Sequence, residues 1–522
     1  MRSQRRHGIT VSLLIALCVS GSADAQTNIY DLPIREHLYP NGLRLLVLER
    51  PGDHRVAAKI FTDFGAMMEV PGMLGAAHFL EHLMFKGTTS LGSTDWEAER
   101  PHIEAIRTTE AELIEELNRE RNPLRERGVF NDYAHARTSP RIEMLYDRIR
   151  QLGVEVAKFR DNGAMMRWYQ AYGGERLTAS TEQEYMKFDI NLPASRVELF
   201  FRIEADRMRN TIFREFDQER MILVEQRLGD LNRPTTPFYE EMNATVGVIH
   251  PVFWPEGHAS DFKNYTRSYE RELYEHFFVP NNTTLVLIGG VSFDEMVPVV
   301  DHYFGWMERA PAPTRIRAIE PRPVAERRLI YRSDDLSPRL DIRYRIPGVG
   351  HPERPGLDVV GEILSMALRE VLQTAEIGAE VNVNTRVVHE TRFGVPATMN
   401  IEVIASDAGQ LQAVERIVEE TIATMVSEPA TEARMQRARK RLRNEWFRTA
   451  LDSDRLAFVI GHFQVMDRWQ TLEQFLMARE QTINTDVMLL AARYFIPENR
   501  TVGIAVPNPG ATHDVSGGGN AR

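Results

Sequence analysis

Two histidines and a glutamate stand close together near the N-terminus, in the segment AAHFLEHLMFKGT that runs from Ala76 to Thr88. On a helix, His78 and His82 lie one above the other on the same face, because they are four residues apart. Two imidazoles placed in this way can bind one metal ion, and a third protein ligand would still leave a position for water. Glu81 lies at the edge of that face, where its carboxylate can take a proton from the water. The spacing therefore predicts a hydrolytic metal site.

The residues around the trio predict that its helix is buried. Apolar side chains fill the remaining positions, namely Phe79, Leu80, Leu83, Met84 and Phe85. Two histidines without partners would be costly in such a helix, which favours a bound ion over an ordinary core position. Zinc is the default metal for histidine and carboxylate ligands, although the ligand types also suit manganese or cobalt.

The segments on either side of the trio indicate the elements that position it. Residues 37–51 and 55–69 are rich in strand formers and flank a Pro-Gly-Asp-His turn, which predicts a β-hairpin leading into the metal-binding helix. Residues from about 90 to 170 carry charged helical runs and are interpreted as an inserted helical hairpin. These inserted helices are expected to be solvated and amphipathic, and binding of a partner protein by them is the alternative.

The chain repeats its own beginning after a proline-rich stretch. Residues 328–366 resemble residues 44–83 in their order of strand, strand, Pro-Gly and helix. When the two Pro-Gly pairs are superposed, Glu362 and Met366 fall where His78 and His82 stand, so the second copy lacks the metal site. The predicted fold class is α/β (α+β), with two related domains in tandem, of which the first has the metal site and the helical insertion.

Length, charge and the N-terminus limit the class of protein. The chain has 522 residues, which exceeds one hydrophobic core, and a net charge of −11, which argues against nucleic acid as a partner. Residues 1–25 are predicted to be a signal peptide, with arginines, an apolar run and an A-x-A cleavage site. The single cysteine, Cys18, lies inside this segment, so the mature chain is expected to hold no disulfide. No later stretch is long enough to span a membrane. We therefore expect an exported protein, periplasmic in a Gram-negative host.

These patterns give a predicted domain organisation. The first domain, which has the metal site, is expected over residues 27–310 and the second domain over residues 325–507. Between them, residues 311–324 form a proline-rich linker, and residues 508–522 form a tail that is rich in glycine, serine and asparagine.

Together, several motifs make the chain resemble the pitrilysin/insulinase family of zinc peptidases, the inverzincins, whose signature is H-x-x-E-H. The branch with the mitochondrial processing peptidase is the most similar. The motifs are GAAHFLEHLMFKGT, Gly173-Gly174, EADRMRN, EF-x-x-ER at Glu215 to Arg220, and VPNNTTLVLIGGVS before HYFGWMER. The resemblance implies two pitrilysin-type domains, a Zn²⁺ ion bound by His78 and His82, and Glu81 as the general base on a zinc-activated water. It also implies peptides or unfolded protein segments as substrates. Since the family encloses peptides in a shell of which this chain supplies half, a homodimer, or a heterodimer with a related chain lacking the motif, is expected.

Two positions depart from the family pattern. The family takes its third zinc ligand seven residues after the position of Glu219, where this chain has Gln226. Glu225 is the predicted ligand instead, through a shift or bulge of the helix, with Glu219 as an outer-shell carboxylate that orients a histidine. The family usually has Asn-Ala to hold the substrate backbone at Thr178 and Ala179. The predicted substrate-binding residues are therefore Thr178 and Ala179, with a threonine in place of the asparagine.

The sequence leaves two functions open. The first is an exported zinc metalloendopeptidase, which the intact His78, Glu81 and His82 favour. The second is a non-catalytic or impaired subunit that binds peptides or scaffolds an active partner, which Gln226 and Thr178 favour.

Overall fold

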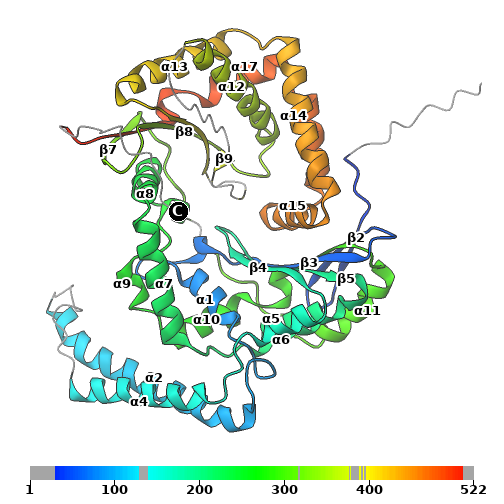
Figure 1. Cartoon of the computed structure of the whole chain (residues 1–522), viewed down its shortest axis with the longest axis vertical. Helices are drawn as coiled ribbons and strands as arrows, with labels where there is room; N and C mark the ends of the chain where they lie inside the picture. Colours follow the sequence, from blue (N-terminus) through cyan, green and yellow to red (C-terminus); the bar gives the residue numbers. More distant parts are fainter. Residues whose placement is uncertain are drawn as a thin grey trace, which may run out of the picture.

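The computed structural model describes residues 30–127, 139–315, 318–375, 377, 387–388, 392 and 396–509. The predicted signal peptide and most of the predicted tail lie outside these residues. Two β-sheets dominate the described chain, and helices cover them (Figure 1). None of the described helices is both long enough and apolar enough to cross a membrane.

The first sheet has six strands in the order β1-β2-β6-β3-β5-β4. Their bounds are Ile34–Leu38 for β1, Arg44–Glu49 for β2, Arg55–Thr62 for β3, Glu175–Thr181 for β4, Met186–Pro193 for β5 and Thr283–Gly289 for β6. Strands β2 and β6 are parallel, and the other neighbours are antiparallel.

The predicted hairpin between residues 37–51 and 55–69 is wrong in its pairing. Strands β2 and β3 exist, but β6 lies between them, parallel to β2 and antiparallel to β3. Strand β2 instead forms its hairpin with β1. Strand β6 is fully buried and carries the apolar run TTLVLIG, so pairing on both edges satisfies all of its backbone groups.

The second sheet has five strands in the order β7-β11-β8-β10-β9. Their bounds are Arg327–Arg332 for β7, Arg339–Pro347 for β8, Val387–Val388 for β9, Pro396–Ile404 for β10 and Arg500–Val506 for β11. Its order and strand directions repeat those of β2-β6-β3-β5-β4. The repetition seen in the sequence therefore extends to the topology of the two sheets.

Most helices of the first half pack in the core on one face of the first sheet. They are α1 (Ala76–Met84), α5 (Ala164–Ala171), α6 (Glu198–Asn210), α7 (Phe216–Leu231), α9 (Ala259–Phe262), α10 (Arg267–Phe277) and α11 (Phe293–Phe304). Helix α8 (Thr235–Val246) packs instead against β7 and β11 of the second sheet. The inserted helices α2 (Trp96–Glu126) and α4 (Pro140–Ala157) pack against each other through a small apolar core of their own. They project from the first sheet at the lower end of the view (Figure 1).

Helices of the second half divide between the two sheets. They are α12 (Arg354–Thr374), α13 (Leu411–Ser427), α14 (Glu432–Leu451), α15 (Ser453–Met466), α16 (Thr471–Gln481) and α17 (Asn484–Tyr494). Helices α12, α13 and α17 cover the second sheet. Helix α15 instead packs on the outer face of the first sheet, against β3 and β6 (Figure 1).

Candidate metal centre

The helix that carries the histidines begins at a sharply defined point. Gly75 precedes α1 with φ of 88°, and a Cβ atom there would lie 2.8 Å from the Tyr265 hydroxyl. The buried Glu69 carboxylate accepts hydrogen bonds from the backbone N–H groups of Gly75 and Ala77, at 2.7 and 2.8 Å. These contacts satisfy helix N–H groups that would otherwise have no partner, and they fix the start of α1.

The two imidazoles converge as their spacing predicts. The Nε2 atoms of His78 and His82 are 3.2 Å apart. Two nitrogen ligands of one tetrahedral zinc ion, each about 2.0–2.1 Å from the metal, would be about 3.3 Å apart. Burial and the neighbouring His82 lower the pKa of His78, which favours the neutral imidazole that a metal requires.

Glu81 is held beside the histidines at the end of an edge strand. Its side chain is buried, and its Oε2 atom accepts a hydrogen bond of 2.6 Å from the Thr181 hydroxyl. Thr181 is the last residue of β4, and among the described residues β4 pairs only with β5, so that its other edge is free of described strands. The carboxylate therefore lies where an unpaired strand edge reaches α1.

The predicted outer-shell residue, Glu219, touches the second histidine from α7. Its Oε2 atom lies 3.1 Å from Nδ1 of His82, and its Oε1 atom lies 2.6 Å from Nζ of Lys86. Burial alone would raise the pKa of Glu219, but His82 and Lys86 outweigh burial and lower it. An ionised carboxylate on Nδ1 leaves Nε2 of His82 free for a metal, which is the contact that an outer-shell carboxylate makes.

The third ligand is the incomplete part of the centre. Glu225 and Gln226 are both exposed on α7. Within the described part of the chain, no three histidine, cysteine or carboxylate side chains come together as a metal-binding group. The described side chains therefore offer zinc two imidazole ligands and an adjacent base, but no third protein ligand beside them. The role of Glu225 as that ligand stays a prediction.

Two carboxylates near His78 were missed by the sequence interpretation. The charges of Asp230 and Glu256 act on His78 and oppose the lowering of its pKa. Asp230 is four residues after Gln226 on α7, so helical periodicity puts it on the face of the expected ligand and could have pointed to it. Glu256 lies outside any helix or strand, and no local pattern predicts its position.

The predicted substrate-binding pair, Thr178 and Ala179, lies in β4. Thr178 is exposed and Ala179 is half-buried, and both residues pair with residues of the neighbouring strand β5. They therefore belong to the strand that ends at Glu81 and whose edge away from β5 has no partner among the described strands.

Comparison with known proteins identifies the family. Residues 44–100 match the family described as Insulinase (Peptidase family M16), and residues 265–442 match the Peptidase M16 inactive domain. The chain belongs to the insulinase family of peptidases.

Named relatives agree with this assignment. Zinc protease PqqE of Helicobacter pylori is 22% identical over 204 residues, which cover 38% of this chain and 46% of that protein. The chain thus spans about half the length of this curated relative.

Solved structures show the same fold at low sequence identity. A protease from Helicobacter pylori has a TM-score of 0.70 at 16% identity, over 91% of this chain and 100% of that one. The first half of the periplasmic protease PqqL from Escherichia coli has a TM-score of 0.63 at 14% identity, over 91% of this chain and 92% of that one.

Proposed function

We propose that this chain is an exported zinc metalloendopeptidase that cleaves peptides or unfolded protein segments. The observation that carries the proposal is the convergence of His78 and His82, with Nε2 atoms 3.2 Å apart, beside the buried carboxylate of Glu81. Zinc bound there would supply Lewis-acid activation of water and of the scissile carbonyl. Glu225 is proposed as the third protein ligand.

The roles of the chain's own groups follow from their contacts. Glu81 would take a proton from the attacking water and pass it to the leaving amine, with Thr181 holding its second oxygen in place. Glu219 would hold the ring orientation of His82 through Nδ1. An extended substrate would pair with the free edge of β4, at Thr178 and Ala179, and so reach Glu81.

Metal analysis of the mature chain and a peptide-cleavage assay test this function. We expect one zinc per chain, and Glu81→Gln should keep the zinc while lowering turnover by at least 100-fold, because the variant lacks the base. Glu225→Ala should lose the zinc, whereas its neighbour Gln226→Ala should keep it. Loss of zinc in Asp230→Ala alone would move the third ligand to that residue and contradict the role of Glu225.

The second candidate function is a non-catalytic subunit that binds peptides or scaffolds an active partner. The exposed Gln226 and the missing three-ligand group in the described residues favour it. This alternative would be established by a wild-type chain that takes up no zinc from added metal and cleaves no peptide, and whose Glu81→Gln variant binds peptides as the wild type does.

We further propose a periplasmic location and a dimer, either of two copies or with a related chain that lacks the motif. The match to one half of PqqL supports the need for a second half. Light scattering of the mature protein at micromolar concentration should give twice the chain mass for a homodimer, and a monomer would point to a separate partner chain.

A further inference from the structure

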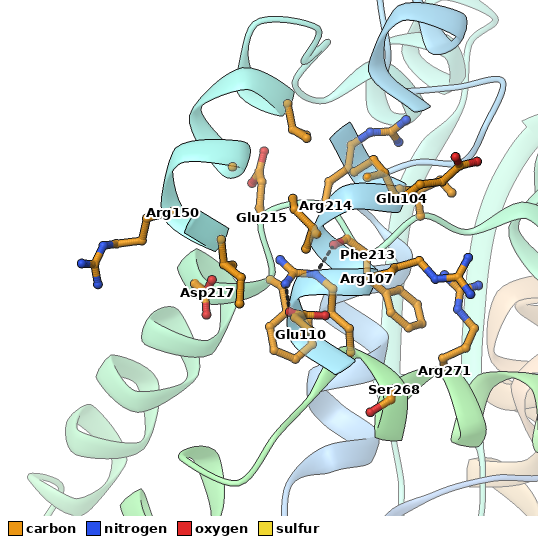
Figure 2. Close-up of a pocket in the computed structure, with 18 of the residues that line it drawn as sticks. Glu104, Arg107, Glu110, Arg150, Phe213, Arg214, Glu215, Asp217, Ser268 and Arg271 are labelled. Carbon is orange, nitrogen blue, oxygen red and sulfur yellow. Dashed lines mark hydrogen bonds and ion pairs between the residues drawn. The ribbon is translucent and has the colours of Figure 1, made fainter. Parts of the chain in front are cut away.

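A large cavity lies beside the inserted helices, apart from the metal centre. Its volume is about 1220 Å³, and it is lined by α2, α4, residues 212–218 and the first turns of α10 (Figure 2). His78, Glu81, His82 and Glu219 do not line it. The proposed peptidase function therefore does not account for this cavity.

Most arginines of the cavity are neutralised by carboxylates. Arg214 forms two contacts with the buried Glu99, at 2.6 and 2.8 Å. Arg267 pairs with Glu110, and Nε of Arg160 lies 2.9 Å from Glu215. These pairs shape the walls of the cavity and leave no charge to attract a ligand.

Two other arginines keep their charge. Arg107 and Arg271 form no ion pair with a carboxylate within the described residues, and their side chains approach each other at one end of the cavity (Figure 2). The Arg271 guanidinium lies 4.4 Å from the centre of the Phe213 ring and donates one hydrogen bond of 3.3 Å to the carbonyl of Thr211. Burial and the positive charge of Arg107 lower the pKa of Arg271, against the opposing charges of Tyr274 and Glu275. An anion between the two guanidinium groups would relieve their repulsion.

The rest of the cavity suits an apolar chain. Apolar side chains from all of its walls line it, among them Ile103, Ile114, Val154, Phe213 and Phe216. Val154 is 63% exposed, so an apolar ligand against it would remove this surface from water. The ligand class is therefore an apolar chain that ends in an anion.

Polar groups along the walls favour a peptide over a fatty acid. The carboxylates of Glu104 and Glu272 form no hydrogen bond or ion pair within the described residues, and they could accept from the backbone N–H groups of a peptide. A fatty acid has no donors for them. The volume is also above the range of about 300–1,000 Å³ that is typical of small-molecule sites.

We propose that this cavity binds the apolar C-terminal end of a peptide, with the terminal carboxylate between Arg107 and Arg271. The proposal goes beyond the peptidase function, because binding here requires neither a metal nor turnover. A chain that fails to cleave peptides could still bind one in this cavity, so the two proposals fail separately.

The experiment measures binding of two peptides to the full mature chain that carries Glu81→Gln, by fluorescence anisotropy. One probe is a labelled octapeptide of leucine, valine and alanine with a free C-terminal carboxylate, and the other is the same peptide with a C-terminal amide. We expect the amide to bind at least 10-fold more weakly. Arg107→Gln should weaken the carboxylate probe about 10-fold and leave the amide probe unchanged. Because Arg107 is exposed, this variant should fold.

Matched variants and competitors complete the test. Arg148→Gln replaces an exposed arginine of α4 outside the cavity and should change nothing, while Val154→Asp should weaken both probes. Equal affinity for the two probes, or equal effects of Arg107→Gln and Arg148→Gln, would overturn the proposal. Loss of binding on addition of EDTA would place the peptide at the metal centre instead. Displacement of the probe by dodecanoate at a concentration equal to or below that of the unlabelled peptide would replace the peptide with a fatty acid.

Discussion

At the scale of residues, the candidate centre is extended outward by a series of charged contacts. His82 contacts Glu219, Glu219 pairs with Lys86, and Lys86 lies 3.4 Å from Glu215, which also pairs with Arg160. Glu219, Lys86, Glu215 and Arg160 each have a partner of opposite charge, which holds the carboxylate of Glu219 in place against His82. The orientation of one predicted ligand thus depends on residues that would not touch the metal.

Glu219→Gln tests this dependence. The amide has no charge to hold the N–H of His82 and Lys86, so we expect zinc to dissociate about 10- to 100-fold more readily. Competition with a chelator of known affinity measures the change. Asp217→Asn, an exposed change on the same helix, serves as the control and should keep the wild-type affinity. Unchanged zinc affinity in Glu219→Gln would remove the outer-shell role.

Glu69 predicts a pH dependence of stability. Burial raises the pKa of Glu69 from 4.5 to about 8, against the opposing effect of the N–H groups of Gly75 and Ala77. The folded state therefore keeps a proton that the unfolded chain loses above its own pKa of 4.5. As the pH rises from about 5 to 8, this group should lower the free energy of unfolding by at most about 1.4 kcal/mol per pH unit.

Urea unfolding of Glu69→Gln between pH 5 and 8 measures the effect. The variant should show a smaller decline with pH than the wild type, because its side chain does not titrate. Glu97→Gln, at an exposed position of α2, should reproduce the wild-type slope. The same decline in Glu69→Gln would mean that Glu69 is ionised throughout this range.

At the scale of elements, α15 joins the two halves of the chain. Its residues Leu456, Ala457 and Ile460 pack on the outer face of the first sheet, with Leu46 and Phe61. Lys59 on that face is buried and pairs with Asp189 at 3.1 Å and with Asp454 of α15 at 2.8 Å. Removal of one partner would leave a buried charge poorly compensated, so the helix and the sheet depend on each other.

Gly461 shows how close this packing is. A Cβ atom at Gly461 would lie 2.0 Å from the Phe61 ring, which is itself buried and cannot move away freely. Gly461→Ala should therefore destabilise the chain by about 1–3 kcal/mol, although alanine favours helices. Gly229→Ala on α7 is the matched control, since its Cβ would meet no atom within 4 Å, and it should be neutral or stabilising by up to about 1 kcal/mol. Equal effects in chemical denaturation would contradict the close contact.

At the scale of the whole molecule, the predicted domain boundary does not separate two independent cores. The predicted second domain over residues 325–507 includes α15 and α16, which contribute to the core on the first sheet. Without them, an apolar sheet face with Leu46, Leu48, Phe61 and Val286 would be open to water. The first half of the chain should therefore not be stable alone.

Expression of residues 30–315 without the remainder tests this expectation. The fragment should aggregate or bind a hydrophobic dye strongly, and co-expression with residues 318–522 should restore solubility. A monomeric fragment with cooperative unfolding and little dye binding would show that the first domain folds without α15.

What the sequence by itself determined is local. A spacing of four residues puts His78 and His82 on one face of any helix. Runs of strand formers predicted β2 and β3, and charged helical runs predicted the inserted helices α2 and α4. The order of elements also showed the repeat of the first half in the second. These features depend on residues within a few turns of one another, so they can be recognised without the fold.

Only the tertiary structure decided the contacts between distant segments. It inserted β6 between β2 and β3, brought Thr181 to Glu81 and Glu219 to His82, and laid α15 on the first sheet. Each of these contacts joins residues that are about 100 or more positions apart. Such pairs form because buried strands must have hydrogen-bonded neighbours and apolar faces must be covered, and many segments of the chain could meet either need. The choice among them is made by the packing of the whole molecule.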